Sequence, residues 1–163
     1  DQIAEKLRLL RNYGSKVRYE HLEKGVNSRL DEIQAKVLSI KLKHLDEWNT
    51  RRRNIARLYS EELKNISGII LPKYDDGDVW HMFCIITKKR DELKDYLTQN
   101  KIGSSIHYPK PVHMQNAYAK NYHKGAFPVT ERISDEILSL PIGPHLGLHE
   151  AQHCADVIKR FFS

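Results

Sequence analysis

The chain has 163 residues and a mass of 19.1 kDa, with 40% hydrophobic and 29% charged residues, a balance typical of globular proteins. No apolar run approaches the roughly 20 residues that a bilayer-spanning helix needs, which argues against a membrane protein. The net charge of +6 is dispersed among acidic residues, whereas a nucleic-acid-binding surface would be denser and interleaved with aromatic side chains.

The first residues predict a helix over residues 1–11, because Ile3, Leu7 and Leu10 recur at helical spacing. Gly14 should end this helix, since glycine readily adopts the left-handed conformation that closes a helix. Residues 16–25 are polar and aperiodic and are predicted to form a loop. Because the sequence opens inside a helical pattern without an initiator methionine, we expect it to be a piece of a longer protein.

A single long helix is predicted from Asn27-Ser28 to about residue 63. Asp31 follows Ser28 by three positions, as in a capping box, and no proline or glycine follows before Gly68. Some 35 residues would span about 50 Å at roughly 1.5 Å each. The wide apolar face predicts contact with more than one surface, such as another domain or a second subunit. A kink near Trp48-Asn49 is the alternative.

The remaining residues predict a small domain of about 100 residues. β-Branched and aromatic residues predict strands at 69–71, 79–87 and 104–108, and helical patterns cover 91–100, 127–138 and 150–162. The predicted fold class is therefore α/β, with an α+β small domain in which a long helix feeds a small sheet packed with helices. The predicted domains are a helical part over residues 1–64 and a C-terminal small domain over residues 65–163.

The first candidate site is the segment from Gly25 to Asp31, at the predicted start of the long helix. Free amide groups and the helix dipole attract anions there. The Asn27 side chain would add a neutral donor and Arg29 a forked cation, which together suit a phosphate or a carboxylate. The alternative is that Asn27 or Ser28 merely caps the helix while Arg29 pairs with a surface carboxylate.

The second candidate site is the proline-stiffened segment over residues 106–115. It carries two imidazoles, a phenol and an amide, from His107, His113, Tyr108 and Gln115. Convergent polar side chains on a restrained loop suit a polyhydroxyl ligand such as a sugar. The alternative is an exposed tight loop without a ligand.

The histidines and cysteines predict no metal centre. His149 and His153 are spaced for one helix face, but neither His145 nor Cys154 completes an evident ligand set. Cys84 and Cys154 have no CxxC spacing and are expected to be buried thiols in a reducing compartment, by default the cytoplasm. No nucleophile elbow, Walker loop or dinucleotide fingerprint is present.

At the two candidate sites the sequence resembles the DegT/StrS family of sugar aminotransferases. The resemblance covers nearly the whole chain, with the motifs in family order. The matching stretches are Tyr13-Gly14-Ser15, Gly25-Val26-Asn27-Ser28-Arg29-Leu30-Asp31, Asp46-Glu47-Trp48-Asn49, Val79-Trp80-His81, residues 103–115 and Leu138-Ser139-Leu140-Pro141.

The resemblance implies the C-terminal part of a fold type I enzyme that depends on pyridoxal 5'-phosphate. Such an enzyme passes an amino group, usually from glutamate, to a keto sugar on a nucleotide, and the cofactor provides the electron sink. The motif versions look most like the branch that aminates the third ring carbon of a dTDP-linked keto-deoxysugar. Amination at the fourth carbon is the close rival.

The resemblance also implies roles for individual residues in a homodimer with shared sites. Asn27 would bind the cofactor phosphate of the neighbouring subunit, and Arg29 would assist with that phosphate or with the donor's carboxylate. His107 and Tyr108 become substrate-side candidates. His113 and His81 are further candidates, although packing would explain them equally well.

In that family the lysine that carries the cofactor lies upstream of the matching stretch. No lysine here has a comparable context, so no catalytic residue is expected in this chain, and the chain alone is expected to be inactive. The competing hypothesis is a non-catalytic module that binds a sugar nucleotide or dimerises through the long helix.

Overall fold

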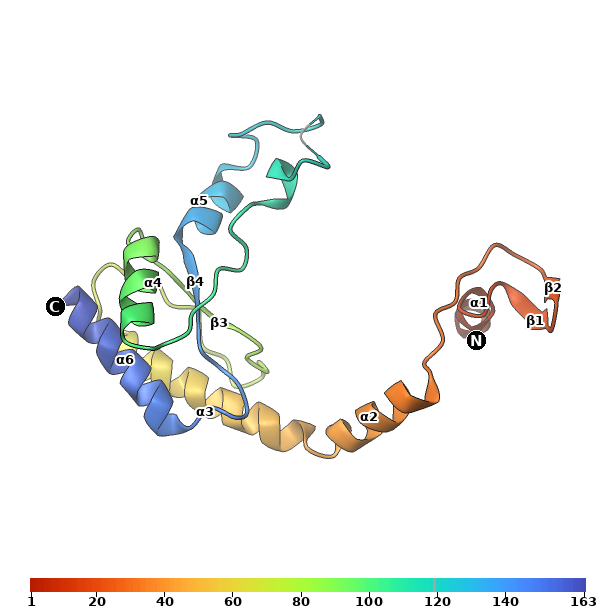
Figure 1. The fold of residues 1–163 in the computed structure, drawn as a ribbon, viewed down its shortest axis with the longest axis horizontal. Helices are drawn as coiled ribbons and strands as arrows, with labels where there is room; N and C mark the ends of the chain where they lie inside the picture. The colour runs from red at the N-terminus through yellow and green to blue at the C-terminus, as the bar shows by residue number, and fades with distance from the viewer. Residues whose placement is uncertain (119) are drawn as a thin grey trace. The chain divides into compact units, whose positions relative to one another are not determined.

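The computed structural model describes residues 1–118 and 120–163. They form two compact units, Asp1–Leu45 and Asp46–Ser163 (Figure 1). None of the helices in the described ranges is both long and apolar enough to cross a membrane.

The first unit begins with α1 (Gln2–Leu10), capped by Asp1, whose side chain accepts the Ala4 N–H at 3.3 Å. An antiparallel hairpin of β1 (Ser15–Val17) and β2 (Glu20–His21) follows, so the predicted loop is wrong over these residues. Gly14 permits this turn, because its φ is +67° and a Cβ atom there would lie 1.9 Å from the Glu23 carbonyl oxygen.

The prediction of one long helix is wrong. The structure has two helices, α2 (Glu32–Leu42) and α3 (Leu45–Leu63). Residues before α2 stay extended because Asn27 forms a β-bridge with Asn12, and the Ser28 amide donates to the Arg11 carbonyl at 2.9 Å. The interruption falls at Lys43-His44, where both amides bond three residues back, as in a tightened last turn.

The second unit is built around an antiparallel pair, β3 (Phe83–Ile86) and β4 (Ile137–Leu140), in register from Phe83↔Leu140 to Ile86↔Ile137. The other elements are α4 (Arg90–Gln99), the 3₁₀ turn η1 (Val112–Met114), α5 (Pro128–Glu136) and α6 (Leu148–Phe162). The strands predicted at 69–71 and 104–108 are reduced to the single bridges Ile70↔Ile86 and Ser105↔Ser139.

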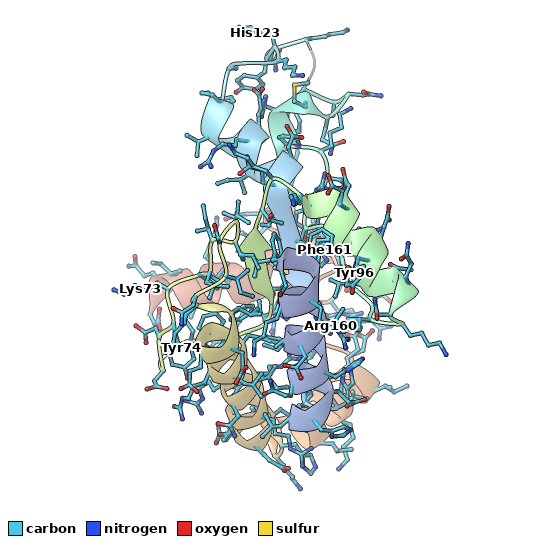
Figure 2. The ribbon with its side chains drawn as sticks, turned by 90° about the vertical axis from the view of Figure 1, so that its left-hand side faces the viewer. Lys73, Tyr74, Tyr96, His123, Arg160 and Phe161 are labelled. Carbon is cyan, nitrogen blue, oxygen red and sulfur yellow. The ribbon has the colours of Figure 1, made fainter. Side chains whose placement is uncertain are left out.

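The core of the second unit lies between this pair of strands and the helices α3, α4 and α6. Helices α4 and α6 lie side by side (Figure 1), and Figure 2 shows Tyr96 of one close to Phe161 of the other, with ring centroids 5.4 Å apart. Helix α3 contributes four fully buried side chains to this core, Ile55, Ala56, Tyr59 and Leu63. The structure therefore groups α3 with the second unit, whereas the predicted division fell after residue 64.

Apolar side chains on α2 predict self-association. The helix, every residue of which is described, buries none of its side chains, and Ile33 is 81% exposed. A cluster of exposed apolar residues marks an interaction surface. We expect sedimentation velocity to detect concentration-dependent oligomers of this chain. The double variant Ile33→Lys/Leu42→Lys should remain monomeric.

The control for this prediction is Val129→Lys, which places a charge on an apolar residue of the second unit that is 63% exposed. That variant should oligomerise as the parent does. A monomeric parent at high concentration would contradict an interaction surface on α2.

Candidate functional site

A cleft of about 460 Å³ in the second unit brings together His81, His107 and Tyr108, three of the four predicted substrate residues. One wall is the segment from Gly103 to Tyr108, which the bridge between Ser105 and Ser139 joins to β4, and the end of β4 with the residues after it completes the lining. The full lining is His81, Met82, Gly103, Ser104, Ser105, His107, Tyr108, Ser139, Leu140, Pro141 and Ile142.

The wall that carries His107 is fastened to β4 at two points. Ser105 and Ser139 exchange backbone hydrogen bonds of 3.2 and 2.8 Å, and the Ser139 hydroxyl lies 2.9 Å from His107 Nδ1. The His107 ring is half-buried and meets the Tyr108 ring edge-on, with centroids 5.4 Å apart. Tyr108 is 70% exposed, so its phenol is open to a ligand.

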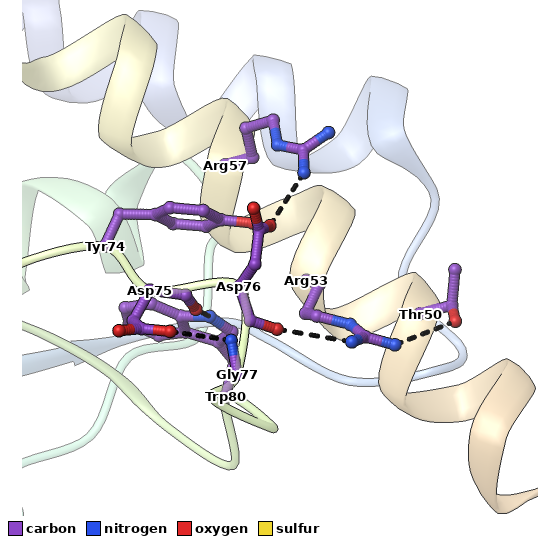
Figure 3. A network of polar contacts seen from close by, with 8 residues as sticks. All are labelled: Thr50, Arg53, Arg57, Tyr74, Asp75, Asp76, Gly77 and Trp80. Carbon is purple, nitrogen blue, oxygen red and sulfur yellow. Dashed lines mark hydrogen bonds and ion pairs between the residues drawn. The ribbon is translucent and has the colours of Figure 1, made fainter.

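A polar network holds the loop that leads to His81 (Figure 3). The Arg57 guanidinium and the Tyr74 hydroxyl both donate to Asp76 Oδ1 at 2.8 Å. These hydrogen bonds, first from Tyr74 and then from Arg57, hold the pKa of the Asp76 carboxyl below its usual value. Because the ion pair is exposed, it adds little to stability; its role is to fix the loop against α3.

Aromatic packing secures the same loop. The Tyr74 ring stacks on Trp80 with centroids 5.4 Å apart, and the Trp80 indole donates to the Asp75 carbonyl at 3.2 Å. Arg52 of α3 donates to the His81 carbonyl at 3.4 Å. The exposed His81 side chain thus extends from an anchored backbone at the entrance of β3.

His113, the fourth predicted substrate residue, does not line the cleft. Its imidazole is buried and its Nε2 donates to Glu131 Oε1 at 2.9 Å, while its ring packs against Phe127. Glu131 also accepts the amides of Gly125 and Phe127. This geometry fits the packing alternative, because His113 and Glu131 together tie the loop before α5 to that helix.

Glu131 makes this loop sensitive to acid. Burial raises the pKa of its carboxyl, but hydrogen bonds from His113, Gly125 and Phe127 outweigh that effect, so the pKa lies below 4.5. A lowered folded-state pKa adds stability that is complete above the unfolded value of 4.5 and is lost as the pH falls through the folded value.

We therefore expect the Gly125 amide resonance to shift in an acid titration with its midpoint below pH 4.5. Glu131→Gln should abolish that inflection, because the amide does not titrate. A midpoint at or above the unfolded value would contradict the hydrogen-bonded carboxylate.

In the first unit, Asn27 and Arg29 lie together but not at a helix start, so that part of the prediction is wrong. Helix α2 begins four residues later at the cap Asp31, whose amide donates to Gln34 Oε1 at 3.4 Å. The acidic residues Asp31 and Glu32 at this helix end disfavour an anion there. The capping alternative for Asn27 is wrong as well.

The Arg29–Asn27 pair still offers a donor set for an anion. Arg29 Nε donates to Asn27 Oδ1 at 3.2 Å, and the guanidinium lies 5.9 Å from the centre of the Tyr13 ring. Within residues 1–118 and 120–163, Arg29 forms no ion pair with a carboxylate. Its two terminal nitrogens therefore match a phosphate group, which a guanidinium binds through paired hydrogen bonds.

The histidines of the last helix do not assemble a metal centre in the described part of the chain, where no three potential ligands come together. His149 and His153 line a separate hollow with Cys154. Burial raises the pKa of the Cys154 thiol to about 11, which disfavours the thiolate form that binds metals. Cys84 is half-buried, and both thiols are free.

Comparison with known proteins places these features in a family. The model of the DegT/DnrJ/EryC1/StrS aminotransferase family matches residues 1–159. The erythromycin biosynthesis sensory transduction protein EryC1 of Saccharopolyspora erythraea is 48% identical over 160 residues, which are 96% of this chain and 44% of that protein. The dTDP-3-amino-3,4,6-trideoxy-alpha-D-glucose transaminase of Streptomyces venezuelae is 46% identical, over 98% of this chain and 43% of that protein.

The fold agrees with the sequence match. The crystal structure of S. venezuelae DesV superposes with a TM-score of 0.95 at 46% identity, covering 99% of this chain and 44% of that one, which confirms the predicted aminotransferase fold. The chain thus spans less than half the length of the curated relatives that it matches. With its fold, motif order and sequence in agreement, the chain belongs to the DegT/DnrJ/EryC1/StrS aminotransferase family.

Proposed function

We propose that this chain is the C-terminal part of an aminotransferase that moves an amino group from glutamate to a dTDP-linked keto-deoxysugar, at the third ring carbon. The family depends on pyridoxal phosphate, and two relatives at 46% identity are named as transaminases of dTDP-3-amino sugars. The observation that carries the proposal is the cleft in which His81, His107 and Tyr108 face one hollow.

The side chains around this cleft suit a sugar nucleotide. Imidazole nitrogens and a phenol can each donate to or accept from the hydroxyl and phosphate oxygens of such a ligand. In the proposed enzyme His107 and Tyr108 bind and orient the sugar, with His81 at the rim. The half-buried His107 ring limits the positions that the reacting carbon can take, which favours a productive orientation.

The cofactor would be held by a different part of the chain. When bound, pyridoxal phosphate supplies the electron sink for amino-group exchange. Asn27 and Arg29 would hold the phosphate of the cofactor in a neighbouring subunit, so the active form is proposed to be a cytoplasmic homodimer. Among the described residues the Arg29 guanidinium forms no ion pair with a carboxylate, which supports this role, because phosphate is the anion that best fits its fork.

The test is transfer of ¹⁵N from labelled glutamate by the intact protein in the presence of pyridoxal phosphate. We expect mass spectrometry to find the label in the product of a dTDP-3-keto-6-deoxysugar, with much less in that of the matched 4-keto sugar. Preferred labelling of the 4-keto sugar would refute the assignment of the ring carbon. If neither sugar is labelled although both bind, the chain belongs to a binding module and the aminotransferase proposal fails.

A further inference from the structure

We propose that Ser139 is a positioning residue, which fixes His107 so that its Nε2–H donates to an oxygen of the ligand in the cleft. The ligand, a nucleotide sugar, is taken from the proposed function, whereas the side-chain geometry is independent of it. Ser139 lines the same cleft, is 5% exposed and lies 2.9 Å from His107 Nδ1 through its hydroxyl.

The strand register explains why a serine stands behind the histidine. Along β4, Leu138 and Leu140 face the core with Phe83 and Ile85, so the intervening Ser139 faces the opposite side of the pair. Both backbone polar groups of Ser139 bond to Ser105. The opposite edge of Ser139 therefore meets β3 in a non-hydrogen-bonded pair, the kind in which side chains come closest.

Cys84 is the partner of Ser139 in that pair, and its sulfur lies 3.2 Å from the Ser139 hydroxyl oxygen. The three side chains thus form a chain from Cys84 through Ser139 to His107. A serine hydroxyl has one proton to donate, and a neutral imidazole nitrogen is a much better acceptor than a thiol sulfur. In the proposed arrangement the proton of Ser139 points to His107 Nδ1 and the Cys84 thiol donates to the serine oxygen, whereas a ring protonated on Nδ1 would instead donate to that oxygen.

The direction of the hydrogen bond between Ser139 and His107 decides which nitrogen of the neutral imidazole carries the proton. With Nδ1 accepting, the neutral His107 ring carries its proton on Nε2 and offers the ligand a donor. The Nε2–H group of His107 needs an oxygen acceptor on the ligand, and a nucleotide sugar has such oxygens both on its diphosphate and on its sugar ring. An imidazole without Ser139 would exchange between its two neutral forms and present the donor only part of the time.

The first test is the ¹⁵N spectrum of the histidine side chains of this chain at mildly alkaline pH, where imidazoles are neutral. The His107 signals are identified by their loss in His107→Gln. We expect a protonated Nε2 and an accepting Nδ1 in the parent, and a mixture of the two neutral forms in Ser139→Ala. A parent with its proton on Nδ1 overturns the proposal, and so does a folded Ser139→Ala chain with the spectrum of the parent.

The measurement on the parent requires no variant, so it decides the direction even if Ser139→Ala fails to fold. Ser134→Ala is the matched control, since Ser134 is also buried but lies outside the cleft. Its His107 signals should equal those of the parent.

The second test uses the intact enzyme. Ser139→Ala should raise KM for the keto sugar nucleotide about tenfold with little change in kcat, as expected for loss of one fixed hydrogen bond. Ser134→Ala should leave both constants unchanged. A fall in kcat alone, in proportion to the folded fraction, would show a merely structural role and overturn the positioning role.

Binding of dTDP alone then identifies the acceptor. If Ser139→Ala lowers the affinity for dTDP as much as the affinity for the sugar nucleotide, the oxygen that accepts from His107 belongs to the diphosphate. If only the affinity for the sugar nucleotide falls, that oxygen belongs to the sugar. Equal affinity of parent and variant for both ligands would overturn the proposal. If the parent enzyme aminates no sugar, the proposed function fails, while the ¹⁵N spectrum still decides the geometry around His107.

Discussion

Replacing Tyr59 with alanine is expected to destabilise the second unit by about 4 kcal/mol, the usual cost of removing a buried aromatic side chain. Tyr59 lies in the C-terminal half of α3, is 0% exposed and packs on Phe83 with ring centroids 5.2 Å apart. Its hydroxyl donates to the Pro141 carbonyl at 2.9 Å, so alanine would also leave that acceptor without its partner. Burial, followed by the nearby Cys154 thiol, raises the pKa of the Tyr59 hydroxyl, which keeps this donor protonated.

Urea unfolding followed by tryptophan fluorescence measures this effect, because Trp80 is buried in the same core. Tyr59→Phe should cost only about 1 kcal/mol, since it removes the hydrogen bond and keeps the ring. Ile33→Ala on the exposed face of α2 should leave the transition unchanged. If Tyr59→Ala unfolded at nearly the urea concentration of the parent, α3 would not belong to this core.

The elements that sequence predicts well are those fixed by nearby residues. Helix α4 was expected at 91–100 and lies at Arg90–Gln99, and α6 was expected at 150–162 and lies at Leu148–Phe162. In both, apolar residues repeat at helical spacing and face one core. A helical repeat of this kind can be recognised from neighbouring residues alone, without knowledge of distant contacts.

The errors come from contacts between distant residues. Ile137 and Leu138 were expected to end a helix, yet they begin β4, because the strand partner Phe83–Ile86 is far away in the sequence. Likewise, the first turn of the expected long helix is held extended by the bridge between Asn12 and Asn27. Short apolar runs fit either structure, and tertiary pairing decides between them.

The same distinction applies to the site. His107 and Tyr108 could be proposed because prolines stiffen the loop that carries them and the family resemblance marks that loop, and the structure brings both residues to one cleft. The buried contact of His113 with Glu131 could not be foreseen, since it joins residues of different elements. Ser139, which lines the same cleft, was not among the predicted residues, although its place between Leu138 and Leu140 is a period-2 signal for a polar residue facing away from the core.

Arg29→Ala in the intact enzyme is expected to weaken the affinity for pyridoxal phosphate by about ten- to a hundredfold, because hydrogen bonds to charged groups contribute about 1.5–3 kcal/mol. Asn27→Ala should have a smaller effect in the same direction. Besides any contact of its own with phosphate, Asn27 accepts from Arg29 Nε at 3.2 Å and so aligns the guanidinium. Folding should change little, since both side chains are exposed.

Titration with the cofactor, followed by absorbance, separates the effect of the positive charge of Arg29 from the effect of its forked geometry. Arg29→Lys keeps the charge but loses the forked donor pair, so it should recover only part of the affinity. Arg18→Ala is the matched control, because it removes an arginine that likewise lies over a tyrosine ring in the first unit, at 4.9 Å from Tyr19. If Arg18→Ala and Arg29→Ala lowered the affinity for the cofactor equally, the effect would come from the change in net charge. If this guanidinium holds the phosphate, of these two variants only Arg29→Ala should lower the affinity for the cofactor.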